Sequence, residues 1–177
     1  MPSRLPALAP SLAPSLAPSL ALSLALLPLA LPAAAGSFSG TVDGEARSWH
    51  VLQVDGAPSA GFADGWMTQV EIFGFPQPGD AGDVTGALEI SLSLMNDTVA
   101  GVSVVYYAEG TRGLYTTDDE DAVQVTLTEL RSEGDTLHLQ GSLEAELYRM
   151  ASLFSEELDY DDSRTVAASF ELTLEAR

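Results

Sequence analysis

Two acidic runs in the second half of the chain carry the residue types that bind calcium. One run covers 118–121 and the other lies within 156–163. Calcium takes six to eight oxygen ligands, often from closely spaced carboxylates on one loop. The second run begins like an EF-hand loop, but Arg164 stands where that loop requires glycine, and no twelfth ligand follows. The runs therefore predict either solvated loops or one looser calcium site, whose ligands would be Asp118, Asp119, Asp121, Asp159 and Asp161.

Aromatic residues near predicted loops form a second candidate site. Sugar-binding β-sandwiches stack sugar rings on exposed aromatic side chains, and aromatic side chains also anchor protein contacts. Four residues are candidates for such a ligand platform: Trp66, Tyr106, Tyr107 and Tyr115. Burial in the core is the alternative, and it is the expectation for both Trp49 and Trp66.

Catalytic constellations are weakly supported by the sequence. With no cysteine, thiolate catalysis and Cys-ligated metals are excluded. The two histidines, His50 and His138, are not flanked by a nucleophile elbow or a metal-binding spacing. Paired carboxylates could serve a glycosidase, but no feature selects two of the 26 acidic residues. We therefore expect a protein that is not an enzyme and that has no cofactor besides the candidate calcium.

The charge balance excludes one large class of partner. The 177 residues contain 7 Lys and Arg against 26 Asp and Glu, a net charge of −19. Nucleic-acid binding requires clustered basic residues, so nucleic acid is not expected as a partner. A surface this acidic indicates either a salt-adapted protein or carboxylates that hold cations.

Residues 1–35 read as a signal peptide. Arg4 lies near the start, and an apolar stretch follows that ends in Ala33-Ala34-Ala35, which places signal-peptidase cleavage before Gly36. The clean apolar run is shorter than the roughly 20 residues that span a bilayer, so no membrane anchor is expected after cleavage. An uncleaved anchor or a Pro-Ala-Leu arm is the alternative. We expect a secreted or periplasmic protein, and the absence of disulfides fits a bacterial or archaeal source.

The elements that must position these residues are β-strands. Apolar and polar residues alternate over 88–94, 137–147 and 166–174, as in strands with one buried and one wet face. Five further strands are predicted, at 38–42, 48–54, 66–73, 99–107 and 123–130. Turn residues such as Asp43-Gly44 and Asn96-Asp97 separate them, and the Gly- and Pro-rich segments 55–65 and 76–86 are expected to be loops.

These patterns predict one all-β domain over 36–177, an antiparallel β-sandwich or flattened barrel of about eight strands. The spacing of Met150, Leu153, Phe154 and Leu158 predicts a short helix at 149–158, with a lid-like loop as the alternative. The apolar strand 99–107 would pair with a second copy if it lay at a sheet edge, so we expect a monomer or an edge-strand dimer.

The start of the domain resembles a known group of proteins. Residues 38–44 read Phe-Ser-Gly-Thr-Val-Asp-Gly, and Trp49 follows five residues later. This opening is similar to that of bacterial secreted β-sandwich domains of unknown function, which begin with a strand, an Asp/Asn-Gly turn and a Trp-bearing second strand. The resemblance covers about 15 residues and the final strand. It implies the fold and no catalytic residue.

The sequence therefore predicts an exported, non-enzymatic module that binds a protein or a glycan partner. Two more specific functions remain open. One is a calcium-stabilised module that uses 118–121 and 156–163, and the other is a carbohydrate-binding domain that uses the loop aromatics.

Overall fold

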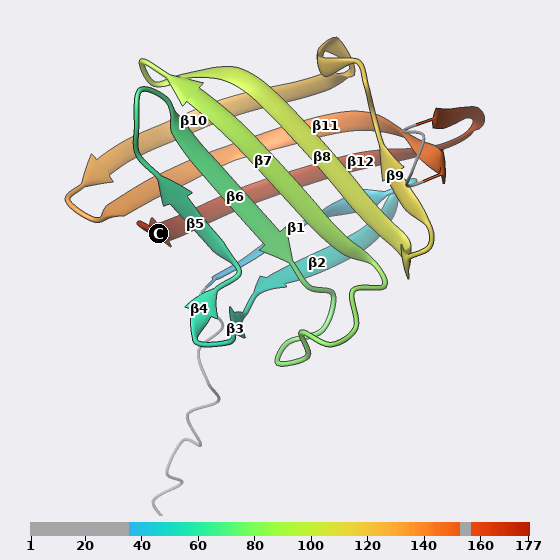
Figure 1. Cartoon of the computed structure of the whole chain (residues 1–177), viewed down its shortest axis with the longest axis horizontal. Helices are drawn as coiled ribbons and strands as arrows, with labels where there is room; N and C mark the ends of the chain where they lie inside the picture. Colours follow the sequence, from blue (N-terminus) through green and yellow to red (C-terminus); the bar gives the residue numbers. More distant parts are fainter. Residues whose placement is uncertain (1–35, 153–156) are drawn as a thin grey trace, which may run out of the picture. The chain divides into compact units, whose positions relative to one another are not determined.

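The computed structural model describes residues 36–152 and 157–177, so the predicted signal peptide lies outside the described residues. The described chain is composed almost entirely of strands (Figure 1). Their bounds are β1 (Gly36–Val42), β2 (Glu45–Val51), β3 (Gln53–Val54), β4 (Ala57–Pro58), β5 (Ala60–Ala63), β6 (Thr68–Gly74), β7 (Ala87–Met95), β8 (Thr98–Thr111), β9 (Leu114–Thr116), β10 (Val123–Glu133), β11 (Thr136–Ser152) and β12 (Glu157–Glu175), with a 3-10 helix η1 (Glu120–Ala122). No helix among these residues is long and apolar enough to cross a membrane.

Ten of the strands form one antiparallel sheet that folds over on itself without closing into a barrel. Its order is β2-β1-β12-β11-β9-β8-β7-β6-β5, and β10 pairs with β11. In Figure 1, β5 to β8 lie across a layer made of β10, β11, β12, β1 and β2. We call these the front and rear layers, and β9 is counted with the front layer because it pairs with β8. The predicted all-β, sandwich-like fold is confirmed.

The 17-residue β11 connects the two layers. Its first part pairs with β10, from Thr136 to Ala145, whereas Tyr148 and Arg149 pair with β9 of the front layer. Two bridges join the layers elsewhere, between His50 and Phe75 and between Phe62 and Ala176.

Two-residue turns set the register of the hairpins. Asp43 and Gly44 have φ of 51° and 79°, and Asn96 and Asp97 have φ of 51° and 61°. Positive φ at both central positions matches the right-handed twist of the flanking strands, and Gly, Asn and Asp tolerate it best. The hairpin turns predicted at these positions are therefore confirmed.

The core lies between the two layers and centres on Trp49, whose side chain is fully buried. The Trp49 ring stacks on Phe38 at 5.3 Å, and its Nε1 donates a hydrogen bond to the Gly86 carbonyl at 2.9 Å. Gly74 makes this packing feasible, because a Cβ there would lie 2.5 Å from the Phe38 ring. Trp49 is thus a core residue, as expected.

Two local predictions are wrong. In place of a helix at 149–158, the described residues continue β11 and begin β12, and Met150 pairs with Leu158; the remaining positions, 153–156, lie outside the described residues. Met150 and Leu158 belong to two strands of one hairpin and not to one helix. The predicted loop 55–65 contains β4 and β5, because Asp55 and Gly56 turn the chain and Ala60 to Ala63 pair with β6.

The strand that was predicted to form a dimer edge is fully paired on one side only. The segment 99–107 falls within β8, which pairs with β7 along its length. On its other side, β9 pairs only with Tyr106 and Tyr107 among the described residues.

Candidate functional site

A bulge in β12 lies where the two acidic runs meet. Tyr148 of β11 pairs with Ser163, and the next residue, Arg149, pairs with Asp159. Three residues of β12 therefore have no partner on β11, namely Tyr160, Asp161 and Asp162. Bulges change the direction of side chains and often occur beside functional sites. Here the bulge directs Tyr160 and Asp162 toward two different sets of neighbours.

Tyr160 contacts the first acidic run. Its hydroxyl donates a hydrogen bond to Asp118 Oδ2 at 3.0 Å, and its ring packs against Tyr148 with centroids 5.0 Å apart and planes tilted by 59°. Tyr160 is 61% exposed, although large aromatic side chains are usually buried. We name the set formed by Asp118, Asp119, Glu146, Tyr148 and Tyr160 the acidic corner.

Carboxylates dominate the electrostatics of the acidic corner. Partial desolvation raises the pKa of Tyr148, and the charges of Glu146, Asp119 and Asp118 raise it further. The hydrogen bond to Asp118 is the main cause of the raised pKa of Tyr160. Among the described residues, no arginine or histidine forms an ion pair with Asp118, Asp119 or Glu146. The corner therefore offers negative charge and two aromatic faces without a cation of its own.

Asp162 lies on the other side of the bulge and is neutralised by its neighbours. It accepts hydrogen bonds from the buried hydroxyl of Tyr115 at 3.0 and 3.1 Å, and it forms ion pairs with Arg149 at 3.4 Å and Arg164 at 3.5 Å. The Arg164 guanidinium also lies 4.9 Å from the centre of the Tyr115 ring. This network joins side chains of β9, β11 and β12, so it holds the bulge in one conformation.

The predicted calcium ligands come together only in part. Asp118 approaches the second run through Tyr160, whereas Asp119 and Asp159 accept hydrogen bonds from backbone N–H groups two residues further on, at Asp121 and Asp161. Carboxylates that cap local turns in this way are common in loops. Among the described residues, no three acidic or histidine side chains are arranged to hold a metal ion.

The four predicted ligand aromatics do not form one platform. Tyr106 and Tyr115 are buried cross-strand partners, and Tyr107 is half-buried against Phe73, with its hydroxyl 2.6 Å from Glu89. Trp66 is 84% exposed, so the expectation that it is a core residue is wrong. It precedes β6, whose first residue Thr68 pairs with Leu94 at one end of β7. Tyr107 pairs with Ala87 at the other end of β7, about 24 Å away along the strand.

Comparisons with protein-family models, with curated proteins and with solved structures found no match. The functional interpretation consequently rests on the residues of this chain.

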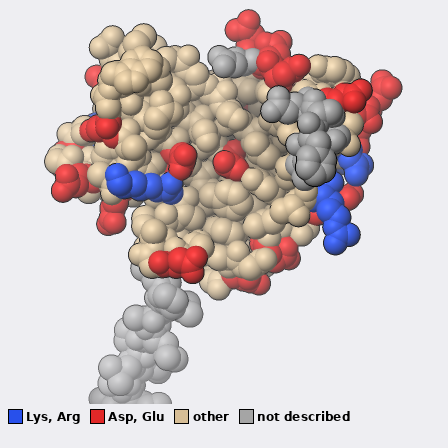
Figure 2. All heavy atoms as spheres, in the orientation of Figure 1, with Lys and Arg blue, Asp and Glu red and all other residues tan. Residues whose placement is uncertain are grey.

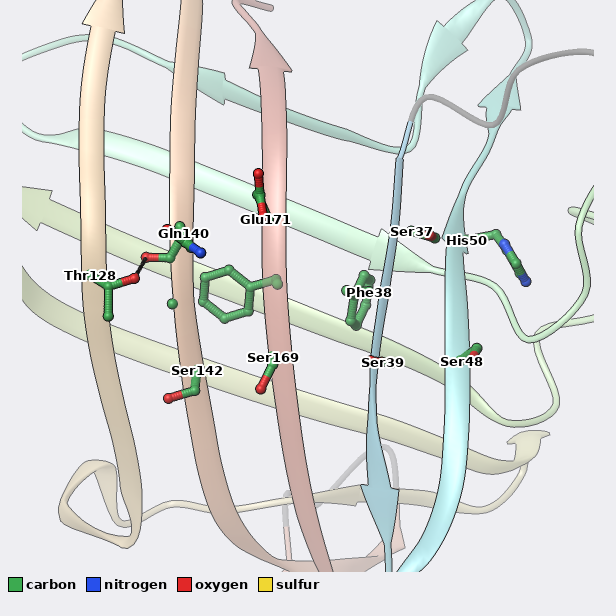
Figure 3. A pocket seen from close by; sticks show the side chains of 12 residues that line it. Ser37, Phe38, Ser39, Ser48, His50, Thr128, Gln140, Ser142, Ser169 and Glu171 are labelled. Carbon is green, nitrogen blue, oxygen red and sulfur yellow. Dashed lines mark hydrogen bonds between the residues drawn. The ribbon is translucent and has the colours of Figure 1, made fainter.

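A groove of about 520 Å³ on the outer face of the rear layer is the second surface feature (Figure 3). A row of hydroxyl groups, one from each strand, runs across this layer, because the register aligns Ser48, Ser39, Ser169, Ser142 and Thr126. All of these except Thr126 line the groove. Hydroxyl groups both donate and accept hydrogen bonds, so the row gives this part of the rear layer a polar surface, which Glu171 also borders.

The two histidines lie on this same face. His50 borders the groove, and Figure 3 shows its ring directed away from Glu171. His138 Nδ1 lies 3.0 Å from the Thr173 hydroxyl, and its Nε2 lies 4.0 Å from Glu133. The 4.0 Å between His138 Nε2 and Glu133 is longer than a hydrogen bond, so the Thr173 hydroxyl, His138 and Glu133 are not joined as in a catalytic triad.

Sequence reasoning missed Tyr148 and Tyr160 as site residues. Tyr160 stands within the second acidic run and Tyr148 follows Glu144 and Glu146, but the alternating pattern of β12 gives no sign of a three-residue bulge. The contact between Tyr160 and Asp118 depends on that bulge, and the two residues are 42 positions apart.

Proposed function

We propose that residues 36–177 form an exported, non-enzymatic binding module that takes a cationic group at the acidic corner. One observation carries this proposal: the paired rings of Tyr148 and Tyr160 stand beside the Asp118 carboxylate, and no cation of the described residues neutralises that carboxylate. An ammonium or guanidinium group over an aromatic face gains about 0.5–2 kcal/mol, depending on its desolvation. The adjacent carboxylates add charge-assisted hydrogen bonds.

The charge of the whole chain supports a cationic partner. Residues 36–177 contain all 26 acids and only six arginines, a net charge of −20. Figure 2 shows acidic side chains around the edge of the front layer and few charges over its middle. A field of one sign raises the association rate of oppositely charged partners and lowers it for like-charged ones.

Export rests on the signal-like segment 1–35. If it is cleaved as proposed, mass spectrometry of the secreted protein will give a chain that begins at Gly36. An intact Met1 on the released protein would contradict export by this route.

Pentalysine is a suitable first probe of the acidic corner. We expect isothermal titration calorimetry to show binding that weakens about three- to tenfold in Tyr160→Ala, because the variant removes one of the two aromatic faces. Asp118→Asn should weaken binding by a similar factor.

Asp97→Asn is the matched control for Asp118→Asn. It removes the same charge from a turn in which Asn also tolerates the φ of 61°. The proposal predicts less than about a twofold effect in this control, since an exposed distant charge is screened. Equal losses in the two variants would mean that pentalysine senses only the net charge, and the proposed site would be wrong.

Calcium binding is the other outcome that the acidic runs allow. A calcium site of micromolar affinity would add about 4 kcal/mol to the free energy of unfolding at a thousandfold excess of calcium. A thermal melt in CaCl₂ and in NaCl of equal ionic strength separates the two ions. A shift specific to calcium and abolished in Asp118→Asn would replace the organic cation by a metal ion as the ligand of the corner.

A further inference from the structure

The polar side chains on the outer faces of the two layers differ in how they are paired. On the front layer, the Ser93 hydroxyl donates a hydrogen bond to Gln69 Oε1 at 2.9 Å. In the groove of the rear layer, the labelled residues form a single hydrogen bond with one another, from the Thr128 hydroxyl to the Gln140 carbonyl at 3.3 Å (Figure 3). The serines of the groove take no part in it, namely Ser37, Ser39, Ser48, Ser142 and Ser169. Their donors and acceptors are therefore free for a ligand.

The groove belongs to a longer trough that follows the strands. A hollow of about 570 Å³ shares Gln140 with the groove and reaches His138. Another hollow, of about 460 Å³, begins at the next outward position of β11 and reaches Glu146. His138 and Glu146 lie about 27 Å apart along β11. A site of this length fits an elongated polymer better than a compact small molecule.

Charge narrows the class of polymer that the trough can take. Glu144 and Glu146 lie at one end, and Glu171 lies near the other. Arg131 is the one arginine among the described residues that line the three hollows, and it forms ion pairs with two glutamates of β10. An anionic polymer would be repelled, and so would a second copy of this chain, because both bring further negative charge.

We infer that the trough on the outer face of the rear layer binds a neutral polysaccharide chain. The hydroxyl groups of such a chain both donate and accept hydrogen bonds, so they complement the free serine hydroxyls along the whole site. The Glu171 carboxylate accepts stronger, charge-assisted hydrogen bonds from sugar hydroxyls. The trough shares only Glu146 with the acidic corner, so the inference stands without the proposed function.

Aromatic stacking contributes little to this site. Phe38 and Phe170 border the groove, but their side chains are buried in the core. Binding then depends on hydrogen bonds that replace bonds to water, and each of these gives a small net gain. We expect a dissociation constant of about 1 mM for a short oligosaccharide, and stronger retention by a polymer that offers many binding positions.

Affinity electrophoresis tests the inference. The protein is run in native gels that contain dextran, soluble starch, hydroxyethylcellulose or galactomannan, beside a gel without polymer. We expect at least one of these neutral polymers to slow the protein, and we expect alginate, which carries carboxylates, to have no such effect. If none of the neutral polymers slows the protein, the inference is wrong.

Alanine substitutions test whether retention depends on the serine hydroxyls. One variant combines substitutions on three adjacent strands of the trough: Ser39→Ala, Ser169→Ala and Ser142→Ala. It should bind the retaining polymer about tenfold more weakly. The matched control combines the same change at three outward serines of the front layer: Ser91→Ala, Ser93→Ala and Ser103→Ala. The control should stay within about twofold of the parent, and equal losses in the two variants would overturn the inference.

Chemical shifts locate the ligand on the parent protein without any substitution. An oligosaccharide cut from the retaining polymer is titrated into the isotope-labelled protein and followed by NMR. We expect the largest shifts in the amides of 37–39, 140–142 and 169–171, and small shifts in 91–103. The largest shifts on the front layer would overturn the inference, even if the alanine variant of the trough did not fold.

Tyr160→Ala separates the trough from the acidic corner. This variant should retain the polysaccharide like the parent, because Tyr160 does not line the trough. Loss of retention would place the sugar on the rings of Tyr148 and Tyr160 and would overturn the trough as the site. Unchanged pentalysine binding in the same variant would instead contradict the proposed function and would leave retention by the trough as expected.

Discussion

The hydroxyl of Tyr115 donates to both carboxylate oxygens of Asp162, at 3.0 and 3.1 Å, across 47 positions of sequence. The donor comes from β9 of the front layer and the acceptor from the bulge of β12 in the rear layer. This bond therefore connects the two layers at the end of the molecule where the acidic corner lies. Arg149 and Arg164 complete the network and supply the positive charge that Asp162 needs.

Removing the Asp162 carboxylate should destabilise the fold. In Asp162→Ala, the buried Tyr115 hydroxyl loses its acceptor and two arginines lose their ion pair, so the free energy of unfolding should fall by about 1–3 kcal/mol. Urea denaturation measures the change. Asp161→Ala, at an exposed position of the same bulge, is the control and should stay within about 0.5 kcal/mol of the parent. An unchanged free energy of unfolding in Asp162→Ala would show that the network contributes no stability.

Alkaline pH should destabilise the protein through Tyr107. Burial raises the pKa of Tyr107 above its ordinary value, and the hydrogen bond to Glu89 raises it further. The folded protein then holds a proton that the unfolded chain releases. The contribution of Tyr107 is complete below about pH 10 and is lost as the pH rises toward the folded pKa, at up to about 1.4 kcal/mol per pH unit.

Urea midpoints measured between about pH 9 and 12 test this sign. Tyr107→Phe should have a flatter dependence on pH than the parent, whatever its stability at neutral pH. An unchanged slope in this variant would assign the alkaline loss to other groups, such as Tyr115, whose pKa is also raised by burial.

The core should not tolerate a methyl group at Gly74. A Cβ at this position would lie 2.5 Å from the Phe38 ring and 2.7 Å from Trp49 Cβ, inside the centre of the core. Gly74→Ala is expected to cost about 1–3 kcal/mol by overpacking. Gly65→Ala meets nothing closer than 3.6 Å and should be close to neutral. If chemical denaturation gives equal stabilities for the two variants, the packing of Phe38 on Trp49 is looser than described.

Salt should stabilise the domain. A net charge of −20 on residues 36–177 repels itself, and at about 0.5 M NaCl screening shortens the range of that repulsion to a few ångströms. The six arginines cannot offset this, because their ion pairs are largely exposed and each is worth at most about 1 kcal/mol. The melting temperature should therefore rise between low salt and about 0.5 M NaCl. A fall over this range would mean that attractive pairs outweigh the repulsion.

The strands that could be predicted are those with strict alternation. Leu88 to Leu94 and Val166 to Leu174 alternate because one face meets the core and the other meets water, and both lie within strands of the structure. β5 has only four residues, mostly small, and β9 has three, so neither offers enough positions for a period to appear. Trp66 shows the limit of reasoning from residue type, because its exposure depends on where a turn places it.

Only the negative charge of the acidic corner could be predicted from the sequence. The sequence shows both acidic runs, but the pairing of β9 with the second half of β11 decides that they meet. The bulge then decides which side chains face Asp118. Neither feature leaves a local pattern, because the bulge interrupts a register that exists only between strands.

The pairing of β1 with β12 has a consequence for when this chain folds. Ser39 lies beside Ser169, so the strand nearest the start of the domain acquires its second neighbour only after nearly the whole sequence is present. Contacts between such distant residues make folding slow. In a chain synthesised from its N-terminus, hairpins such as β1–β2 and β6–β7 could pair early, whereas the rear layer could be completed only after the last strand had emerged.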